Sequence, residues 1–318
     1  MIIPVFNRAR RLKEAVISIL LQTYEDIEII IVDDGSSDNT VDVVDGLVKK
    51  WPDTIRAFKQ ENSGPGVARQ LGTTMSTGEF IQYLDSDDLL LPDKFKIQVD
   101  ALQKCPEVGI AYGISYQADY SRTPPLVTGP IRATGQELEY LFPKLLNERW
   151  WTTSSPLYKR TTIDHIGAWK DLINEEDWEF DARAGRLKTI LKWTPVGVSI
   201  RRINIAGDHL SYGGSTDKKK ISARVVSKTL LYVYAREVGI NICQQEMKTF
   251  SRECFLLARQ CGEAGLEKES KEMFFLAREA AGKFRKFRLD FVLYSLSGRF
   301  LGWEKTGSWA SKLRDMLK

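Results

Sequence analysis

The first 90 residues alternate between short apolar runs and segments in which apolar residues recur every three or four positions. Residues 2–6 form a short apolar run, and in residues 28–32 four β-branched residues follow Glu28; both patterns are typical of buried strands, and weaker runs follow at 55–59 and 80–84. Helical spacing between these runs predicts helices over residues 11–22, 40–50 and 66–77. This order predicts an α/β fold with a Rossmann-like, mostly parallel sheet and helices on both faces.

The pattern after residue 100 is less regular and becomes helical toward the end of the chain. Residues 196–205 have β character, and residues 208–220 are polar and glycine-rich, as in a loop. From Ile221 onward helical spacing returns, and later helices are expected over residues 268–281, 291–301 and 309–317. Before them, one helix face is expected to comprise Phe250, Cys254, Leu257, Ala258 and Cys261. We therefore expect an α/β domain over residues 1–222 and a helical C-terminal region over residues 223–318, whose hairpins loosely resemble a tetratricopeptide unit.

Composition narrows the class of protein. The net charge of +4 is too small to indicate a nucleic-acid partner, and two histidines exclude a His-rich metal centre. Four cysteines without a CxxC pair indicate neither a zinc site nor a disulfide framework. Apolar runs stay short of the about 20 residues of a membrane span, and the N-terminus lacks the form of a signal peptide. These features predict a reducing, cytoplasmic location.

An acidic triplet, Asp85-Ser86-Asp87, follows the strand predicted over residues 80–84. Alternation along a strand would place both carboxylates on one side, where their hard oxygens suit Mg²⁺ or Mn²⁺ together with a diphosphate. The alternative is a capping loop before the next helix, because Asp is a good N-cap residue. From the residues alone, the two interpretations stand about even.

A second acidic cluster, Asp33-Asp34-Gly35-Ser36, follows the strand over residues 28–32. Ligands of open α/β sheets bind at the carboxyl ends of strands, so both clusters are expected to line one crevice. Buried acids need donors, and a uracil N–H and ribose hydroxyls are such donors. The rival interpretation is a phosphoaspartyl site, which requires a lysine at a later strand end that the sequence does not clearly supply.

A glycine-rich loop, Asn62-Ser63-Gly64-Pro65-Gly66, precedes the third predicted helix. Backbone N–H groups at a helix start favour an anion, and Arg69 would add a phosphate or ribose contact. The same residues also make a good turn without any ligand.

A third acidic cluster, Asn174-Glu175-Glu176-Asp177-Trp178, lies far along the chain. A carboxylate there would accept the proton of an acceptor hydroxyl. The residues alone slightly favour the alternative, an acidic first turn that offsets the helix dipole.

Taken in order, these motifs resemble a family 2 glycosyltransferase with the GT-A fold. The resemblance covers about residues 1–210 and is carried by residues 2–8, 22–24, 31–40, 62–69 and 78–88, with Glu176-Asp177-Trp178 later in the chain. It implies an inverting transferase that uses a divalent cation, Mg²⁺ or Mn²⁺, and a nucleotide diphosphate sugar, most often a UDP-sugar. The acceptor implied is a hydroxyl of a saccharide or of a lipid-linked molecule, in cell-surface polysaccharide or glycan synthesis.

The resemblance also implies a role for each matching residue. The base and ribose would be bordered by Pro4, Phe6, Asn7, Asp33 and Asp34, with Ser63, Gly64 and Arg69 near the nucleotide. Asp85, Ser86 and Asp87 would bracket the ribose, metal and diphosphate, with Asp87 the leading metal ligand. Asp177 would be the general base, with Glu176 beside it.

The chain departs from the family pattern near residue 203. Many members carry a histidine there that helps to bind metal or diphosphate, whereas this chain has Ile203-Asn204. His209 would take over that role, although a loop histidine is more often solvated. The chain also begins inside what is usually the first strand, so a few upstream residues are expected to be missing.

Aromatic residues suggest further contacts. Trp150, Trp151 and Trp178 would form an acceptor platform, because indole faces stack on sugar rings; packing in the core is the alternative. The run Lys283-Phe284-Arg285-Lys286-Phe287-Arg288 would touch an anionic membrane at the inner face, with a solvated helix edge as the favoured alternative.

Two other functions compete with the transferase. A non-catalytic sugar-nucleotide or glycan-binding module on the same fold would share the motifs. A nucleotidyltransferase usually has a glycine-rich signature with Arg and Lys near its N-terminus, where this chain has Pro4-Val5-Phe6-Asn7.

Overall fold

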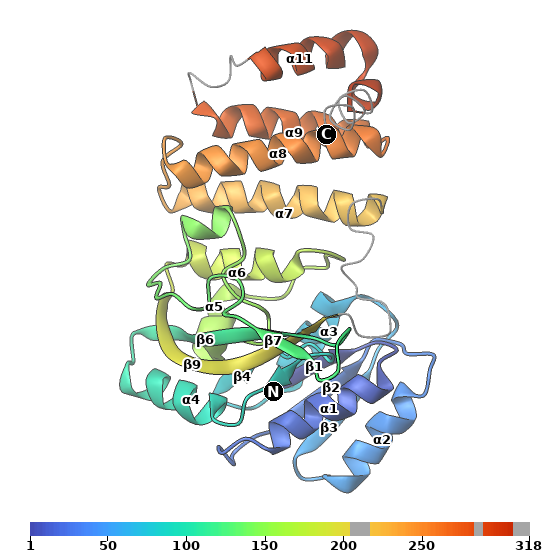
Figure 1. Ribbon diagram of the computed structural model, residues 1–318, viewed down its shortest axis with the longest axis vertical. Coiled ribbons are helices and arrows are strands. Elements are labelled where there is room, and N and C mark those ends of the chain that lie inside the picture. Colours follow the sequence, from blue (N-terminus) through green and yellow to red (C-terminus); the bar gives the residue numbers. More distant parts are fainter. Residues whose placement is uncertain (204–216, 283–288, 308–318) are drawn as a thin grey trace. The chain divides into compact units, whose positions relative to one another are not determined.

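The computed structural model describes residues 1–203, 217–282 and 289–307 (Figure 1). The chain forms two compact units. The first comprises residues 1–141, 149–171 and 187 to the end of the last strand, and the second comprises residues 142–148, 172–186 and the helices after residue 217. The domain boundary expected at residue 222 falls within helix α7 (Lys218–Glu237). The division into domains at that residue stays a prediction.

The first unit opens with a parallel sheet of three strands. They are β1 (Ile2–Val5), β2 (Ile29–Asp33) and β3 (Ile55–Lys59), in the spatial order β1-β2-β3. Ile2 pairs with Ile30 and Ile29 pairs with Ile55, so the two outer strands flank β2 in register. The strands expected from the apolar runs are confirmed, and their carboxyl ends lie at one edge.

The second sheet of this unit is mixed, which the sequence did not predict. Its path is β4-β8-β6-β9-β5, and β7 pairs with β6. The pair β6–β9 is parallel, whereas the other four pairs are antiparallel. A parallel bridge from Ile2 to Tyr83 joins β1 to the chain just after β4. The strands are β4 (Phe80–Gln82), β5 (Leu89–Leu90), β6 (Val108–Asp119), β7 (Leu126–Thr128), β8 (Leu157–Lys159) and β9 (Ile190–Ile203).

Helices cover both faces of the parallel sheet, as expected. Side chains alternate along a strand, so neighbouring residues face opposite layers. Ile3 and Ile31 join a core cluster with residues of α1 and α2. On the other face Gly72 of α3 approaches β1 so closely that an added Cβ would lie 2.4 Å from Ile2 Cγ2. The helices of this unit are α1 (Ala9–Leu20), α2 (Thr40–Lys50), α3 (Pro65–Met75), α4 (Lys94–Lys104) and α5 (Arg160–Ile166).

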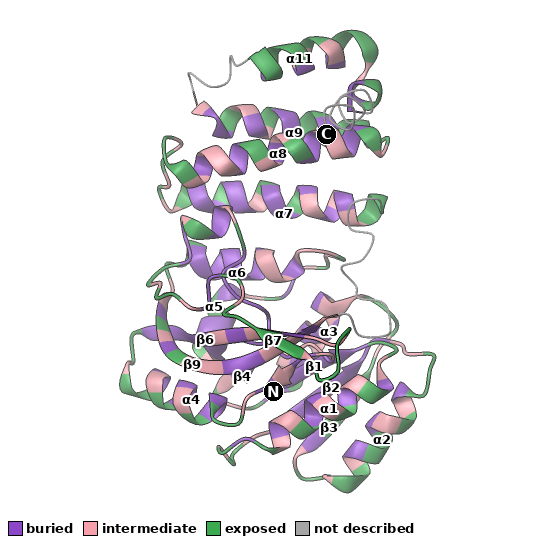
Figure 2. Ribbon diagram, in the orientation of Figure 1, coloured by how far each residue is buried: buried purple, intermediate pink, exposed green. Residues whose placement is uncertain are grey.

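The second unit consists of helices. They are α6 (Glu176–Arg186), α7, α8 (Gln245–Glu263), α9 (Glu267–Ala280) and α11 (Leu289–Leu301), with the short turn η1 (Lys144–Leu146). The predicted apolar face of α8 is buried throughout, as the purple segments of Figure 2 show, and it comprises Phe250, Cys254, Leu257, Ala258 and Cys261. The helix expected over residues 309–317 lies outside the described residues. Within the described ranges, no helix is long and apolar enough to cross a membrane.

Candidate functional site

The triplet Asp85-Ser86-Asp87 lies in a tight turn between β4 and β5. Strand β4 ends at Gln82, and the backbone N–H of Asp88 donates a hydrogen bond to the Asp85 carbonyl at 2.9 Å. The strand alternation that suggested a common side for the two carboxylates therefore does not apply, because the chain is already turning there. The N-cap position of α4 is Asp93, so the triplet is not the cap of that helix either.

Asp85 is bonded to a buried arginine. Arg69 on α3 donates from Nη2 to Asp85 Oδ1 at 2.8 Å, and its guanidinium lies 4.9 Å from the centre of the Trp169 ring. The Arg69 side chain is 4% exposed, whereas the Asp85 side chain is 37% exposed. A buried cation held by a ring and a carboxylate has little freedom, so Arg69 restricts the orientation of Asp85, whose side chain stays partly exposed.

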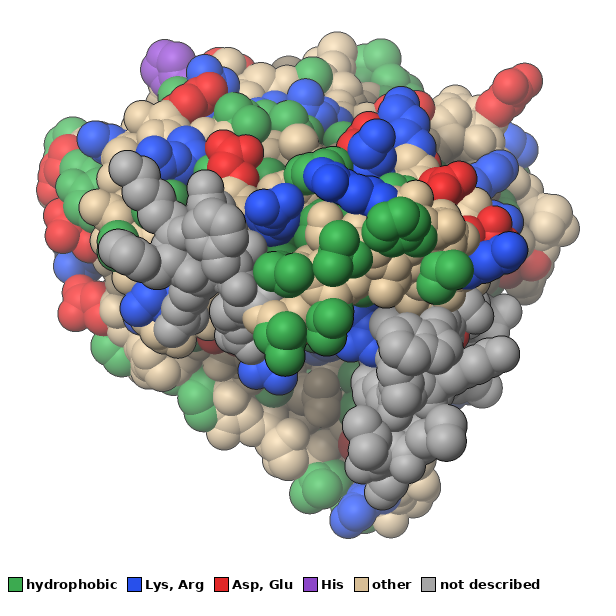
Figure 3. Space-filling view, turned by 90° about the horizontal axis from the view of Figure 1, so that it is seen from above, with side chains coloured by type: hydrophobic (Ala, Val, Ile, Leu, Met, Phe, Trp, Pro, Cys, Tyr) green, Lys and Arg blue, Asp and Glu red, His purple; other side chains and the backbone are tan. Residues whose placement is uncertain are grey.

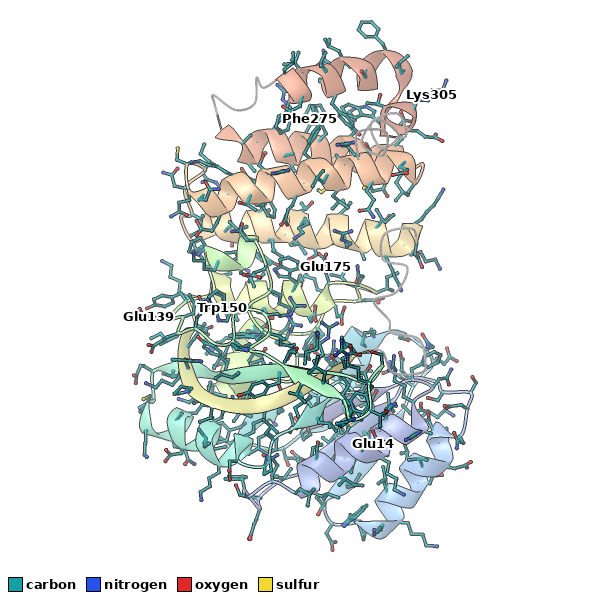
Figure 4. The ribbon with its side chains drawn as sticks, viewed as in Figure 1. Glu14, Glu139, Trp150, Glu175, Phe275 and Lys305 are labelled. Carbon is teal, nitrogen blue, oxygen red and sulfur yellow. The ribbon has the colours of Figure 1, made fainter. Side chains whose placement is uncertain are left out.

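Asp87 is bonded to a second arginine from the start of α1. Arg8 Nη1 donates to Asp87 Oδ2 at 2.6 Å, and both side chains are 16% exposed. The Asp87 carbonyl accepts a hydrogen bond from Arg202, which is buried at the end of β9 and also bonds to Glu14 of α1 (Figure 4). The turn is thus tied to helices and strands on either side through cations.

Asp88 is the buried member of the acidic run. Its carboxylate accepts hydrogen bonds from Ser154 Oγ at 2.9 Å and from the backbone N–H of Arg202 at 3.2 Å. Burial, followed by the charges of Asp87 and Asp85, raises the pKa of Asp88. Its partners are those of a residue that anchors the turn to β9.

Asp34 organises the glycine-rich loop. Its Oδ1 accepts hydrogen bonds from the backbone N–H of Ser63 and from Gln60 Nε2, each at 2.8 Å, and its Oδ2 accepts one from the N–H of Gly64 at 2.9 Å. Gly64 has φ +89°, a left-handed conformation that favours glycine. The loop is therefore shaped by a carboxylate that already has its donors.

Asp33 differs from its neighbour. Its Oδ1 accepts a hydrogen bond from the backbone N–H of Ser36 at 3.0 Å, whereas its buried Oδ2 has no hydrogen-bond donor among the described residues. Lys59 Nζ lies 4.0 Å from Oδ2. A buried acceptor without a donor costs about 1–3 kcal/mol, so this oxygen would gain from an added N–H or O–H group.

Of the remaining residues expected near the nucleotide, Asn7 contacts the loop that follows Asp33 and Asp34. Asn7 Oδ1 accepts a hydrogen bond from the backbone N–H of Ser37 at 2.8 Å, and the N–H of Asn7 donates to Ser36 Oγ at 2.9 Å. Phe6 is exposed, Pro4 is buried within β1, and Ser86 is buried in the turn. Asn7 therefore fixes the loop after β2, and Phe6 presents the accessible ring.

The third acidic cluster belongs to the second unit. Glu176 and Asp177 begin α6, where their negative charge lies at the positive end of the helix dipole. Glu176 is buried and Asp177 is half-buried. Glu175, labelled in Figure 4, accepts a hydrogen bond from Arg224 Nε of α7 at 3.0 Å. The position of these acids at the start of α6 is consistent with an acidic first turn that offsets the helix dipole. The general-base role of Asp177 stays a prediction.

The tryptophans expected to form an acceptor platform are engaged in packing. Trp151 is fully buried, with its ring centre 5.2 Å from that of Tyr112, and Trp150 is 4% exposed. Buried rings offer no face to a sugar, so the structure supports the packing alternative for both. Trp178 donates from Nε1 to the Leu145 carbonyl at 2.9 Å, and Lys228 Nζ lies 3.6 Å from its ring centre.

The candidate metal ligands at the turn are the carboxylates of Asp85 and Asp87. Among the described residues, no group of three or more His, Cys, Asp or Glu is placed to hold a metal ion. His209, the expected additional ligand, lies outside the described residues. Asp85 and Asp87 are hard oxygen donors with partly exposed side chains, which fits a cation that keeps water and phosphate oxygens as its other ligands.

Sequence reasoning missed three residues that hold the turn. Arg8 directly follows Asn7, and Asp88 directly follows the triplet, so their position next to predicted site residues was a usable signal. Arg202 gave no signal, because its contacts with Glu14 and Asp87 join segments far apart in the chain.

Comparison with known proteins places this arrangement in a family. Residues 1–160 match the model of glycosyl transferase family 2. The chain is 29% identical over 233 residues to an uncharacterized glycosyltransferase of Nostoc sp., which covers 70% of each protein. It is 34% identical over 121 residues to glycosyltransferase GlyG of Streptococcus pneumoniae, 38% of this chain and 40% of that protein. The chain thus matches less than half of the length of GlyG.

Solved structures share the fold. The crystal structure of S. aureus TarS 1–349 in complex with UDP-GlcNAc matches with a TM-score of 0.62 at 15% identity, over 98% of this chain and 90% of that chain. The mannosyltransferase PcManGT from Pyrobaculum calidifontis, in complex with GDP-Man and Mn²⁺, matches with a TM-score of 0.56 at 16% identity, over 99% and 86%. The chain belongs to glycosyl transferase family 2 and has the GT-A fold of these glycosyltransferases.

Proposed function

We propose that this glycosyltransferase is an inverting, metal-dependent enzyme that transfers a sugar from a UDP-sugar to a hydroxyl of a saccharide or lipid-linked acceptor, in cell-surface polysaccharide or glycan synthesis. The observation that carries the proposal is the turn at Asp85 and Asp87. Each carboxylate is bonded to an arginine, at 2.8 Å from Arg69 and 2.6 Å from Arg8. Paired carboxylates and cations are what a metal diphosphate requires.

The structural relatives support a nucleotide diphosphate sugar as the donor, and the identity of its nucleotide base is a further proposal. TarS binds UDP-GlcNAc and PcManGT binds GDP-Man, so both of these structurally similar proteins bind a nucleotide diphosphate sugar. A pyrimidine or purine base would gain from the buried Asp33 Oδ2 acceptor, for which the described part of the chain supplies no donor. We favour uracil because its N3–H is a single donor suited to one carboxylate oxygen.

A divalent cation would be held by Asp87 and Asp85. Their oxygens fit Mg²⁺ or Mn²⁺, and the cation would neutralise charge on the departing diphosphate. Arg8 would also contribute to binding the diphosphate, because it is within hydrogen-bond distance of Asp87 and has a partly exposed side chain. A second anion beside this turn would compete with Asp87 for the Arg8 guanidinium.

The glycine-rich loop would shape the nucleotide side of the site. Asp34 ties down the backbone at Ser63 and Gly64, and α3 begins at Pro65. Because the loop is fixed before any ligand arrives, it would bind with a smaller loss of conformational entropy.

Asp177 is the proposed general base. Inversion is a single displacement in which a carboxylate removes the proton of the acceptor hydroxyl while the nucleotide diphosphate leaves. The assignment rests on the motif Glu176-Asp177-Trp178 and on the half-buried position of Asp177 at the start of α6.

Titration calorimetry with UDP, with and without Mn²⁺, tests the metal and donor proposals. We expect Mn²⁺ to strengthen UDP binding by the wild type, and Asp87→Ala to weaken the Mn²⁺-dependent part by at least about tenfold, or 1.4 kcal/mol. Asp100→Ala is the matched control, since its exposed carboxylate bonds only to Lys104 on the same helix among the described contacts. Equal metal dependence in Asp87→Ala would refute the ligand assignment, and tighter binding of GDP than UDP would refute the choice of base.

The base proposal requires a separate measurement. Asp177→Asn keeps the shape of the side chain and removes its basicity, so we expect unchanged UDP affinity and a loss of transfer of about 100-fold or more. Transfer would be measured on the acceptor found by screening UDP- and GDP-sugars. Glu237→Gln, in an exposed ion pair with Arg186, is the control. Turnover retained in Asp177→Asn would place the base elsewhere, while donor binding without any transfer in the wild type would support the binding-module alternative.

A further inference from the structure

Helix α11 is apolar on two opposite faces. Its inner face packs in the second unit: the Phe291 ring lies 4.8 Å from that of Phe255, and the Tyr294 ring lies 5.4 Å from that of Phe274. Gly298 lets the Trp303 ring pack closely against the same face of the helix, because an added Cβ would lie 2.9 Å from that ring. This inner face anchors the helix in the second unit, whereas the apolar residues of the other face are exposed.

The outer face of α11 carries a continuous apolar stripe. Its residues recur at the spacing of one helix face, and each is exposed; they are Leu289, Val292, Leu293, Leu296 and Phe300. Phe300 is 83% exposed and Leu289 is 72% exposed. Figure 3 shows hydrophobic side chains gathered at this end of the molecule with Lys and Arg beside them. Single exposed leucines are common, but a continuous stripe of five apolar residues is typical of a surface that binds a protein or a membrane.

The excess positive charge of the chain is concentrated in the part of the sequence that contains the same helix. Residues 283–318 contain nine Lys or Arg and three Asp or Glu, whereas residues 1–282 contain 37 and 39. The whole excess of positive charge therefore comes from the last ninth of the sequence. Arg299 and Lys305 are the two cations of this segment among the described residues, and both are exposed, as are the acids Asp290 and Glu304; Lys305 is labelled in Figure 4. The other seven cations belong to the flanking parts of the sequence, residues 283–288 and 308–318.

We propose that the outer face of α11 is a docking surface for an anionic lipid bilayer. An apolar stripe flanked by cations lies in the interface of such a membrane, with its apolar side chains below the headgroups and its cations among them. A nucleic acid would satisfy the cations but not the stripe. A second copy would satisfy the stripe but would bring two positively charged regions together, which is unfavourable. The proposal is independent of the donor, metal and base assigned above.

Co-sedimentation with lipid vesicles tests the proposal on the full chain. We expect the protein to bind vesicles of phosphatidylcholine mixed with phosphatidylglycerol and to remain in solution with phosphatidylcholine alone. The variant Leu293→Ser/Leu296→Ser/Phe300→Ser should bind at least about tenfold more weakly. Reversing two charges, in Arg299→Glu/Lys305→Glu, should also weaken binding at least about tenfold, because each cation near an anionic surface changes the affinity about fivefold.

A matched control distinguishes the stripe from apolar surface in general. Val226→Ser/Val233→Ser/Leu256→Ser removes three side chains of the same unit that are 40–45% exposed and should leave vesicle binding unchanged. Circular dichroism would establish that all variants are folded. The proposal is overturned if the wild type does not bind the anionic vesicles, if binding ignores lipid charge, or if the stripe and control variants bind alike. It is also overturned if size-exclusion chromatography shows a dimer that the stripe variant alone loses, since the face would then belong to a second copy.

Discussion

The two acidic clusters of the first unit follow strands of different sheets, β2 and β4, and their carboxylates have different partners. Asp34 is bonded to two backbone N–H groups and one amide, all uncharged. Asp85 and Asp87 are instead bonded to Arg69 and Arg8. A carboxylate saturated by the backbone fixes the shape of a loop. A carboxylate whose partner is a partly exposed side-chain cation, such as Asp87 with Arg8, can exchange that cation for another, as the proposed metal binding requires.

The largest expected effect is the loss of the Asp34 carboxylate. Asp34→Ala leaves the N–H groups of Ser63 and Gly64 without their acceptor, so the free energy of unfolding should fall by about 3 kcal/mol. Urea denaturation would measure it. Asp34→Asn, which keeps one acceptor oxygen, should lose about half as much. If Asp34→Ala is as stable as the wild type, the carboxylate does not shape the loop.

An intermediate effect is expected at the arginines, where burial differs between the two pairs. Arg69→Ala removes a 4% exposed cation from Asp85 and from the Trp169 ring and should lower the free energy of unfolding by about 2 kcal/mol. Arg8→Ala removes a cation that is 16% exposed and should lower it by about 1 kcal/mol or less. The same urea denaturation compares them, and a larger loss in Arg8→Ala would reverse the ranking by burial.

The smallest effect on stability is expected at Asp33. Asp33→Asn removes a buried charge whose Oδ2 has no hydrogen-bond donor among the described residues, so the free energy of unfolding should change by less than about 1 kcal/mol. UDP affinity, measured by calorimetry, should nevertheless fall at least about fivefold, because an acceptor for the base is lost. An unchanged UDP affinity would separate Asp33 from the nucleotide and leave it as a turn residue.

The sequence by itself determined where the strands and helices of the first unit lie and where acidic residues follow the strands. Helix α2 occupies residues 40–50 and strand β3 residues 55–59, as the apolar periodicity predicted. Both properties are local, because the spacing of apolar residues reports which face of an element is buried. The same locality predicted the buried face of α8 from Phe250, Cys254 and Leu257.

Tertiary structure alone decided which groups meet. Arg69 and Asp85 are 16 residues apart, and Arg8 and Asp87 are 79 apart, so no local pattern could pair them. The burial of Trp150 and Trp151 and the antiparallel pairing of β4 with β8 likewise depend on packing between distant segments. A residue type states what chemistry a side chain can perform, but its neighbours across the fold decide whether that side chain packs, fixes a loop or stays accessible to a ligand.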